Sequence, residues 1–323
     1  MGRSGVCKLV RYFHGGINPI TEVIVKNTLK HLKQFSWLRG STIVIGIPYL
    51  WLLACSLVPF IIILKISLVE MEINNPFGTL FSYADGIVSL KIKISNYLFI
   101  ADDNLYVLTY LSSIKFAAIT TMYCLIIGYP FAYFMARARA AIRPTLMMLV
   151  MLPFWTSFLL RIYAWKGMLA NNGVINYFLM SAGVIDSPLH MMNTQFSLLV
   201  GMVYTYLPFM ILPLYTNLSK MDARFIEAAA DLGSTPWSTF WRITVPLSKS
   251  GIIAGSMLVF IPCVGEYVIP ELLGGPETLM IGHVLWDEFF SNNDWPMASA
   301  VTIVVILLIL VPMGVFTKYQ QTK

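Results

Sequence analysis

The sequence contains few charged residues and lacks the motifs of several common enzyme classes. Only 12% of the 323 residues are charged and 57% are hydrophobic, a composition too apolar for an ordinary soluble domain. No glycine is followed directly by lysine, so the G-x-x-x-x-G-K-[ST] loop that binds nucleotide phosphates is absent. The sequence also has no H-E-x-x-H zinc pattern and no G-x-S-x-G nucleophile motif. We therefore expect neither ATP binding through a phosphate loop nor hydrolase activity of these kinds.

Cysteine and histidine are too sparse and too scattered to indicate a metal centre or a disulfide framework. None of the four cysteines shows C-x-x-C spacing; they are Cys7, Cys55, Cys124 and Cys263. Isolated cysteines of this kind are usually small apolar fillers. The sequence therefore predicts no metal site and no cofactor.

Long hydrophobic runs are the main organising feature of the chain. The mean hydropathy is +0.72, and about six runs have the roughly 20 apolar residues that a membrane-spanning helix needs. They are Ile43–Val69, Val107–Ala136, Thr145–Lys166, Phe196–Leu218, Gly251–Leu273 and Met297–Thr317. We therefore expect an all-α polytopic membrane domain over residues 43–317, between an N-terminal arm (1–42) and a short tail (318–323).

The basic residues indicate how this domain is oriented. The arm has seven Lys or Arg residues against one acidic residue, whereas residues 167–195 and 274–296 have no Lys or Arg. Positive residues gather on the cytoplasmic side of membrane proteins. The pattern predicts that both termini and the loop 219–249 are cytoplasmic. The net charge of +6 is thus explained by topology and is not taken as a sign of nucleic-acid binding.

The loop 219–249 is predicted to form two short helices. Asp222 can cap a first helix that carries Phe225, Ala229 and Leu232 at near-helical spacing, and Gly233 can end it. Thr235-Pro236 is typical of a second helix start. An aromatic face then follows at Trp237, Phe240 and Trp241, and Val245-Pro246 is expected to end that helix. Spacing alone would also fit an amphipathic hairpin lying at the membrane surface.

Glu266 lies inside the fifth hydrophobic run, between Pro262 and Pro270, with no cation nearby in the sequence. An ionisable residue at such a position is a functional-site hypothesis. A carboxylate beside aromatic rings suits a diammonium substrate. The rings predicted to line the substrate pathway with Glu266 are Tyr267, Trp155, Tyr204 and Tyr206. The alternative is structural: Glu266 pairs with a cation of a partner subunit or caps a kinked turn.

The register of the cytoplasmic loop resembles a known family. Glu227-Ala228-Ala229, Gly233 and Ile243-Thr244-Val245-Pro246 are similar to the EAA loop of ABC importer permeases, with Val245 where leucine is usual. The resemblance implies a type I ABC importer transmembrane domain whose loop docks on a separate ATPase. The coupling residues it implies are Glu227, Ala228, Ala229, Gly233, Ile243 and Pro246.

Further runs resemble the polyamine permeases of bacterial inner membranes, and within them the permeases for putrescine. These runs include Pro153-Phe-Trp-Thr-Ser157, Asn171-Asn-Gly-Val174, the stretch 265–275 and Asp294-Trp-Pro296. The resemblance implies a non-enzymatic permease that takes up putrescine. The partners it implies are an ATPase dimer, a second permease and a periplasmic polyamine-binding protein. Alternatives are an ABC permease for spermidine or another solute, and a stand-alone secondary transporter or channel.

Overall fold

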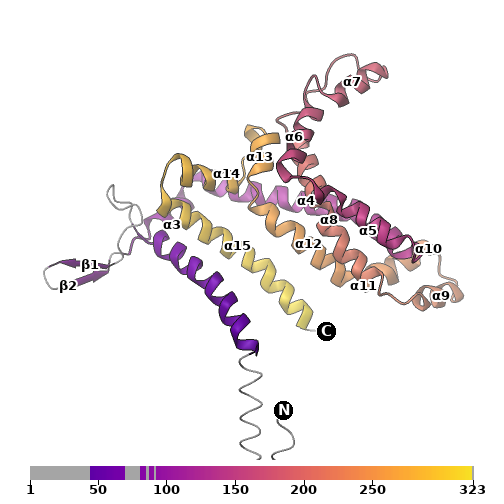
Figure 1. Cartoon of the computed structure of the whole chain (residues 1–323), viewed down its shortest axis with the longest axis horizontal. Coiled ribbons are helices and arrows are strands. Elements are labelled where there is room, and N and C mark those ends of the chain that lie inside the picture. Colours follow the sequence, from indigo (N-terminus) through magenta and orange to yellow (C-terminus); the bar gives the residue numbers. More distant parts are fainter. Residues whose placement is uncertain (1–43, 70–80, 85–86, 91, 322–323) are drawn as a thin grey trace, which may run out of the picture. The chain divides into compact units, whose positions relative to one another are not determined.

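The computed structural model describes residues 44–69, 81–84, 87–90 and 92–321 (Figure 1). The chain divides into two units, Met1–Ile62 and Ile63–Lys323. In the first unit the described residues belong to a helix that runs from Val44 to Ser67. The predicted basic arm, 1–42, lies outside the described residues, as do residues 322 and 323 of the predicted tail.

Among the residues that the structure describes, four helices are long and apolar enough to cross a membrane, and the number rises to six if each of two bent helix pairs counts as one span. The four are Val44–Ser67, α4 (Asn104–Arg137), α8 (Gln195–Leu218) and α15 (Trp295–Gln321). They coincide with four of the six predicted runs. The prediction of about six spans is confirmed, but two of those spans are not single straight helices.

The third predicted span is bent. It consists of α5 (Arg143–Met151), a 3-10 turn (Leu152–Trp155) and α6 (Phe158–Leu169). The axis turns by 86° between the segments that end at Trp155 and begin at Phe158. Pro153 lies in the 3-10 turn, where it can donate no backbone hydrogen bond to continue a helix. The expectation of one continuous helix over 145–166 is therefore wrong.

The fifth predicted span, Gly251–Leu273, is also interrupted. Helix α12 (Lys249–Val264) ends before Glu266, and α13 (Val268–Leu273) starts after it. On the other side, α12 is preceded by an arm that bends away from it by 65°. We call Pro236–Leu247 the coupling arm; it comprises α10 (Pro236–Thr239), the π-helix η2 (Phe240–Thr244) and α11 (Val245–Leu247).

Pro246 does not end the second helix of the loop, contrary to the sequence prediction. The coupling arm continues through it to Leu247, and the break comes at Ser248. Pro246 sits in the first turn of α11, directly after the π-helix.

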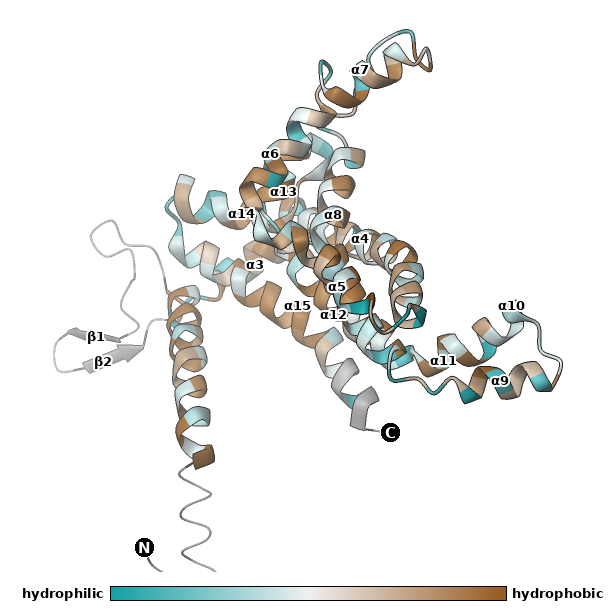
Figure 2. Cartoon of the chain, turned by 45° about the vertical axis from the view of Figure 1, so that its right-hand side comes forward, coloured by the Kyte–Doolittle hydropathy of each residue, from teal (hydrophilic) through white to brown (hydrophobic). Residues whose placement is uncertain are grey.

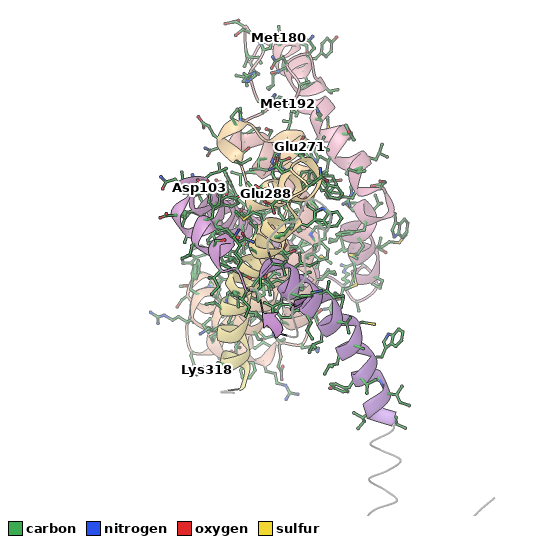
Figure 3. All side chains as sticks on the ribbon, turned by 90° about the vertical axis from the view of Figure 1, so that its left-hand side faces the viewer. Asp103, Met180, Met192, Glu271, Glu288 and Lys318 are labelled. Atoms are coloured by element: carbon green, nitrogen blue, oxygen red, sulfur yellow. The ribbon has the colours of Figure 1, made fainter. Side chains whose placement is uncertain are left out.

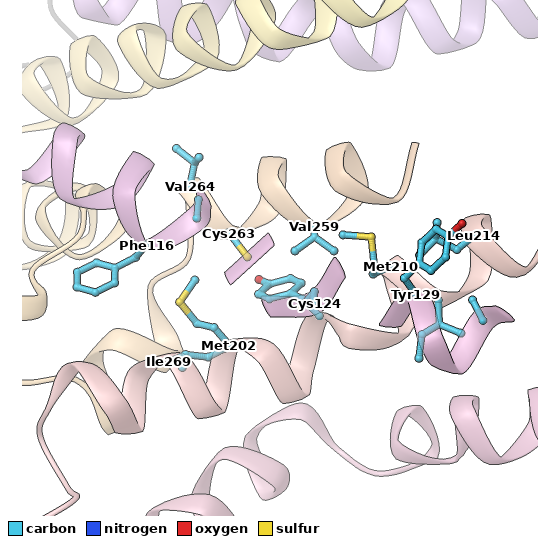
Figure 4. Packing of buried hydrophobic residues seen from close by; sticks show 14 of the residues in the cluster. Phe116, Cys124, Tyr129, Met202, Met210, Leu214, Val259, Cys263, Val264 and Ile269 are labelled. Carbon is cyan, nitrogen blue, oxygen red and sulfur yellow. The ribbon is translucent and has the colours of Figure 1, made fainter. Parts of the chain in front are cut away.

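Helices α4, α8 and α12 pack together and form the main core (Figure 4). The buried side chains include Cys124 from α4, Met210 from α8 and Val259 from α12. Gly255 lets α12 approach α8 closely, because a Cβ there would lie 2.7 Å from Met210 Sδ. Small residues commonly permit such close approach of membrane helices.

Shorter elements complete the second unit. They are a two-stranded antiparallel hairpin of β1 (Phe81–Ala84) and β2 (Ile87–Leu90), and the helices α3 (Ser95–Asp102), α7 (Val174–Ser181), α9 (Arg224–Asp231), η3 (Pro276–Thr278), α14 (Ile281–Trp286) and η4 (Asp287–Ser291). The hairpin is a small exception to the all-α prediction. Figure 2 shows hydrophobic residues along α15, whose exposed side chains include Leu307 and Val311. An apolar outer surface of this kind suits contact with lipid.

Candidate functional site: the loop 219–249 and the carboxylate–aromatic clusters

The first helix of the loop, α9, forms as predicted. The Asp222 carboxylate accepts a hydrogen bond from the backbone N–H of Arg224 at 3.0 Å. Ala229 is buried, whereas Glu227 and Ala228 are exposed. The helix therefore presents part of the Glu-Ala-Ala motif to its surroundings and packs the third residue inward.

Gly233 ends α9 through its backbone conformation. Its φ angle is +76°, and the N–H groups of Ser234 and Gly233 donate to the carbonyls of Ala229 and Ala230, each at 2.9 Å. This pair of bonds is the Schellman arrangement, which favours glycine at the left-handed position. A Cβ at Gly233 would meet nothing within 4 Å. The backbone angle, rather than a shortage of space, therefore requires glycine here.

The second helix of the loop begins at the predicted cap and carries the predicted aromatic residues. Thr235 Oγ1 accepts from the N–H of Ser238 at 3.3 Å. Trp237 and Trp241 are 71% and 53% exposed, whereas Phe240 turns toward the bundle. Of the remaining motif positions, Ile243 is half-buried and Pro246 is exposed.

Glu266 lies in the gap between α12 and α13 rather than inside a helix. Its Oε1 accepts from the N–H groups of Val268 at 3.1 Å and Ile269 at 3.4 Å, so the carboxylate caps α13. Its Oε2 accepts a hydrogen bond from the hydroxyl of Tyr206. Within the part of the chain that the structure describes, no Lys or Arg forms an ion pair with it. The capping role named as the structural alternative is therefore present.

The predicted aromatic residues do not gather into one site. Tyr206 on α8 contacts Glu266, whereas Tyr204 packs its ring edge against Trp165 with the centroids 5.5 Å apart. Trp155 is largely exposed. Tyr267 stacks on Trp286, with ring centroids 4.5 Å apart and planes 10° from parallel. The structure thus brings one of the four predicted rings to the Glu266 carboxylate.

A second cluster, which sequence reasoning missed, surrounds His283 on α14. Its Nε2 lies 2.7 Å from Glu271 Oε2 and its Nδ1 lies 2.9 Å from Asp287 Oδ2. The Tyr267 ring is 6.0 Å from the imidazole. We call Glu271, His283, Asp287, Tyr267 and Trp286 the outer cluster. The spacing of His283 and Asp287 is a helical i, i+4 signal, but Glu271 comes from α13 and joins them only in the fold.

The outer cluster is chemically suited to cations. Its two carboxylates are partly exposed, and the stacked Tyr267–Trp286 pair supplies aromatic faces. Carboxylates and ring faces are the groups that bind ammonium ions. A cavity of about 360 Å³ adjoins it, lined by residues that include Asn193, Glu271, Thr278 and His283. Figure 3 places Glu271 and Glu288 toward one end of the second unit and Lys318 toward the other.

Comparisons with known proteins assign the chain to a family. Residues 124–321 match the family described as binding-protein-dependent transport system inner membrane component. The chain is 37% identical over 281 residues to the spermidine/putrescine transport system permease protein PotB of Haemophilus influenzae, covering 87% of this chain and 93% of that one. It is 42% identical over 240 residues to PotB of Escherichia coli, covering 72% and 87%.

Solved structures agree on the fold. A bacterial ABC transporter involved in the import of alginate matches with a TM-score of 0.60 at 19% identity, covering 87% of this chain and 97% of that one. A likeness at that identity supports the architecture alone. Taken with the multi-pass helical fold and the sequence relatives, it shows that this chain belongs to the inner membrane components of binding-protein-dependent ABC importers, in the polyamine group, and is a permease rather than an enzyme, with ATP hydrolysed by a separate subunit.

Proposed function

We propose that this chain forms half of the translocation pathway of an ATP-driven polyamine importer, with putrescine as its substrate. The other parts are a second permease, an ATPase dimer and a periplasmic polyamine-binding protein. Two lines of support are the names of the relatives, which include both spermidine and putrescine, and the carboxylates that the fold places beside aromatic rings. The observation that carries the proposal is Glu266, a carboxylate at a helix break in a membrane protein.

The geometry at Glu266 suits a site that exchanges partners. Its Oε1 is engaged by the start of α13, while its Oε2 accepts from Tyr206. A carboxylate oxygen can accept more than one hydrogen bond, so a substrate ammonium can bind Oε2 while the α13 cap stays in place. Substrate binding there changes the Tyr206 contact between α8 and the start of α13. That change links occupancy of the site to the packing of two helices.

We assign the outer cluster to a binding step that precedes Glu266 on the same translocation pathway. An ammonium group that arrives from the binding protein meets the carboxylates of Glu271 and Asp287, with the Tyr267–Trp286 stack beside them. The His283 ring lies between these two carboxylates. An arriving diammonium competes with the imidazole for both. Residues 274–296 have no Lys or Arg, which supports an external location for the outer cluster.

We assign coupling to the opposite end. Both termini and the loop 219–249 face the cytoplasm of a bacterial inner membrane, and α9 with the coupling arm docks on the ATPase. The exposed residues Glu227, Ala228, Trp237 and Trp241 are available for that contact, while Gly233 sets the turn between the two helices. Ile243 and Pro246 complete the motif in the arm. ATP binding then moves the loop and shifts the population of inward-open and outward-open states.

The test is uptake of labelled putrescine by the complete assembly carrying Glu266→Gln. Glutamine keeps a side-chain oxygen that can accept from the N–H of Val268, so the change removes charge and retains the cap. We expect uptake to fall by about tenfold or more, because charge-assisted hydrogen bonds contribute roughly 1.5–3 kcal/mol. Undiminished uptake by a normally assembled complex would remove Glu266 from the site.

Cargo identity and transport class are tested separately. Competition of putrescine uptake by spermidine in the same assembly decides between the two polyamines, because only a preferred cargo competes at low excess.

For a stand-alone secondary transporter, the purified chain alone in liposomes would take up substrate under an ion gradient. We expect no uptake without the ATPase, the second permease and ATP.

A further inference from the structure

The coupling arm and Ser248, the residue that follows it, both contact α4. The Phe240 ring meets Tyr129 edge-on with centroids 5.5 Å apart, and it meets Tyr133 at 6.0 Å. Tyr129 and Tyr133 are one helical turn apart on α4, so together they hold Phe240 on one face of that helix. The second contact is a hydrogen bond of 2.9 Å between Tyr129 Oη and Ser248 Oγ. Figure 4 shows Tyr129 within the cluster of buried side chains.

The direction of the Tyr129–Ser248 bond follows from the other bond of the serine. Ser248 Oγ donates to the carbonyl of Val245 at 3.0 Å. A hydroxyl has one proton to donate, so the Ser248 oxygen accepts the proton of Tyr129. Both residues are buried, and a buried hydroxyl that loses its partner is costly. Two consecutive hydrogen bonds therefore link Tyr129 to Ser248 and Ser248 to the Val245 carbonyl.

Ser248 is the residue at which the coupling arm turns by 65° into α12. An arm attached through a single bend can rotate about that bend, and its movement then does not reach the helix beyond. Two contacts of Tyr129 restrain this rotation. The hydrogen bond to Ser248 holds the bend against α4, and the ring contact with Phe240 holds the arm against the same helix. Movement of the arm is thereby passed to α4 as well as to α12.

Helix α4 connects these contacts with the outer cluster. At 34 residues it is about 50 Å long. Near its other end Ser113 Oγ accepts from the N–H of Ile281 at 2.8 Å, at the start of α14. Tyr106 donates from its hydroxyl to Glu288 at 2.6 Å in η4. The helix that bears His283 and Trp286 is therefore bonded to the same helix that holds the coupling arm.

We propose that Tyr129 is a positioning residue that transmits movement of the coupling arm to α4, and through α4 to the outer cluster. The proposal rests on the assignment of the loop 219–249 to coupling. It makes the Tyr129 hydroxyl, which bonds to Ser248 Oγ, necessary for efficient use of ATP. Coupling between distant sites must be shown by an energetic measurement. The ratio of ATP hydrolysed to substrate imported, compared between variants, is such a measurement.

The variant is Tyr129→Phe, which removes the hydroxyl and keeps the ring that packs on Phe240. A matched control exists on the same helix: the Tyr110 hydroxyl donates to the Val301 carbonyl at 2.9 Å, and Tyr110 and Tyr129 are each 8% exposed. Tyr110→Phe therefore removes a buried hydrogen bond of the same kind without touching the coupling arm. The measurement is ATP hydrolysed per substrate molecule imported, in proteoliposomes containing the complete assembly.

We expect Tyr129→Phe to raise this ratio by about fivefold or more, which is the lower end of typical coupling between sites, while Tyr110→Phe leaves it near the wild-type value. Ser248→Ala removes the other partner of the same bond and should give the same rise. The double variant should add little to either single change, because one interaction is lost in all three.

Three outcomes overturn the proposal. They are a wild-type ratio in Tyr129→Phe, an equal rise in Tyr110→Phe, and full additivity of Tyr129→Phe with Ser248→Ala. If Tyr129→Phe does not assemble, the comparison of Ser248→Ala with Tyr110→Phe decides the matter. The ratio can be measured with whichever solute the wild-type assembly imports. A failure of putrescine as cargo is therefore separable from a failure of Tyr129 as a transmitting residue.

Discussion

Replacement of Gly233 should impair coupling through backbone strain alone. The residue has φ +76° in the turn that joins α9 to the coupling arm. A residue with a Cβ in the left-handed region costs roughly 1–2 kcal/mol. No steric cost is added, since a Cβ at this position meets nothing within 4 Å. A penalty of that size changes the population of the correct turn by about 5- to 30-fold.

The expected order of uptake follows from how well each residue tolerates that φ. Asparagine adopts the left-handed region readily, alanine less so, and β-branched residues least. We therefore expect uptake to decrease from wild type through Gly233→Asn and Gly233→Ala to Gly233→Val. Assembly of the membrane helices should be unchanged. The assay is labelled-substrate uptake together with co-purification of the ATPase, measured for all variants side by side.

Gly183 provides a matched control. It has φ +67° and equally open surroundings, but it lies in the stretch 167–195, assigned to the external side. Gly183→Ala carries the same backbone penalty and should leave ATPase binding intact. If Gly233→Val supports full uptake and normal ATPase binding, or if Gly233→Asn is as impaired as Gly233→Val, the turn does not have the role assigned to it.

Three further predictions concern the remaining contacts. Tyr206→Phe should weaken substrate retention and leave assembly intact, because only the bond to Glu266 Oε2 is lost; unchanged uptake kinetics would contradict this. His283→Gln should increase apparent affinity for the diammonium by removing the imidazole that lies between the two carboxylates, so an unchanged half-saturation concentration would count against competition. Gly255→Ala should lower the melting temperature of the complex, since overpacking costs about 1–3 kcal/mol and the new Cβ would lie 2.7 Å from Met210 Sδ. Gly167→Ala in α6, where an added Cβ would meet nothing within 4 Å, should not.

Local signals in the sequence were sufficient to predict where the two helices of the loop begin and where the turn between them lies. Caps and turns depend on a few adjacent residues, so the roles of Asp222, Gly233 and Thr235 were predicted correctly from their types and spacing. The end of the second helix was not, because proline was taken as a stop. The π-helix that precedes Pro246 leaves no distinct pattern in the sequence.

Contacts between distant segments lay beyond such reasoning. The sequence left capping of a kinked turn by Glu266 as an alternative to substrate contact, but no local signal showed that the helix breaks at this residue. The outer cluster joins Glu271 to His283 through a loop and a change of helix. Tyr129 and Ser248 are 119 positions apart, and no periodicity relates them. These features depend on tertiary packing, which a single sequence does not display.

The most direct test is whether the loop 219–249 is accessible to the ATPase. Leu232 is 89% exposed at the end of α9, so Leu232→Cys, in a chain whose native cysteines are replaced, places a thiol where the ATPase should dock. A membrane-impermeant thiol reagent is applied to intact cells and to inside-out vesicles, with and without the ATPase. We predict labelling in inside-out vesicles only, and protection of the thiol when the ATPase is bound. Labelling in intact cells, or labelling unaffected by the ATPase, would contradict the account.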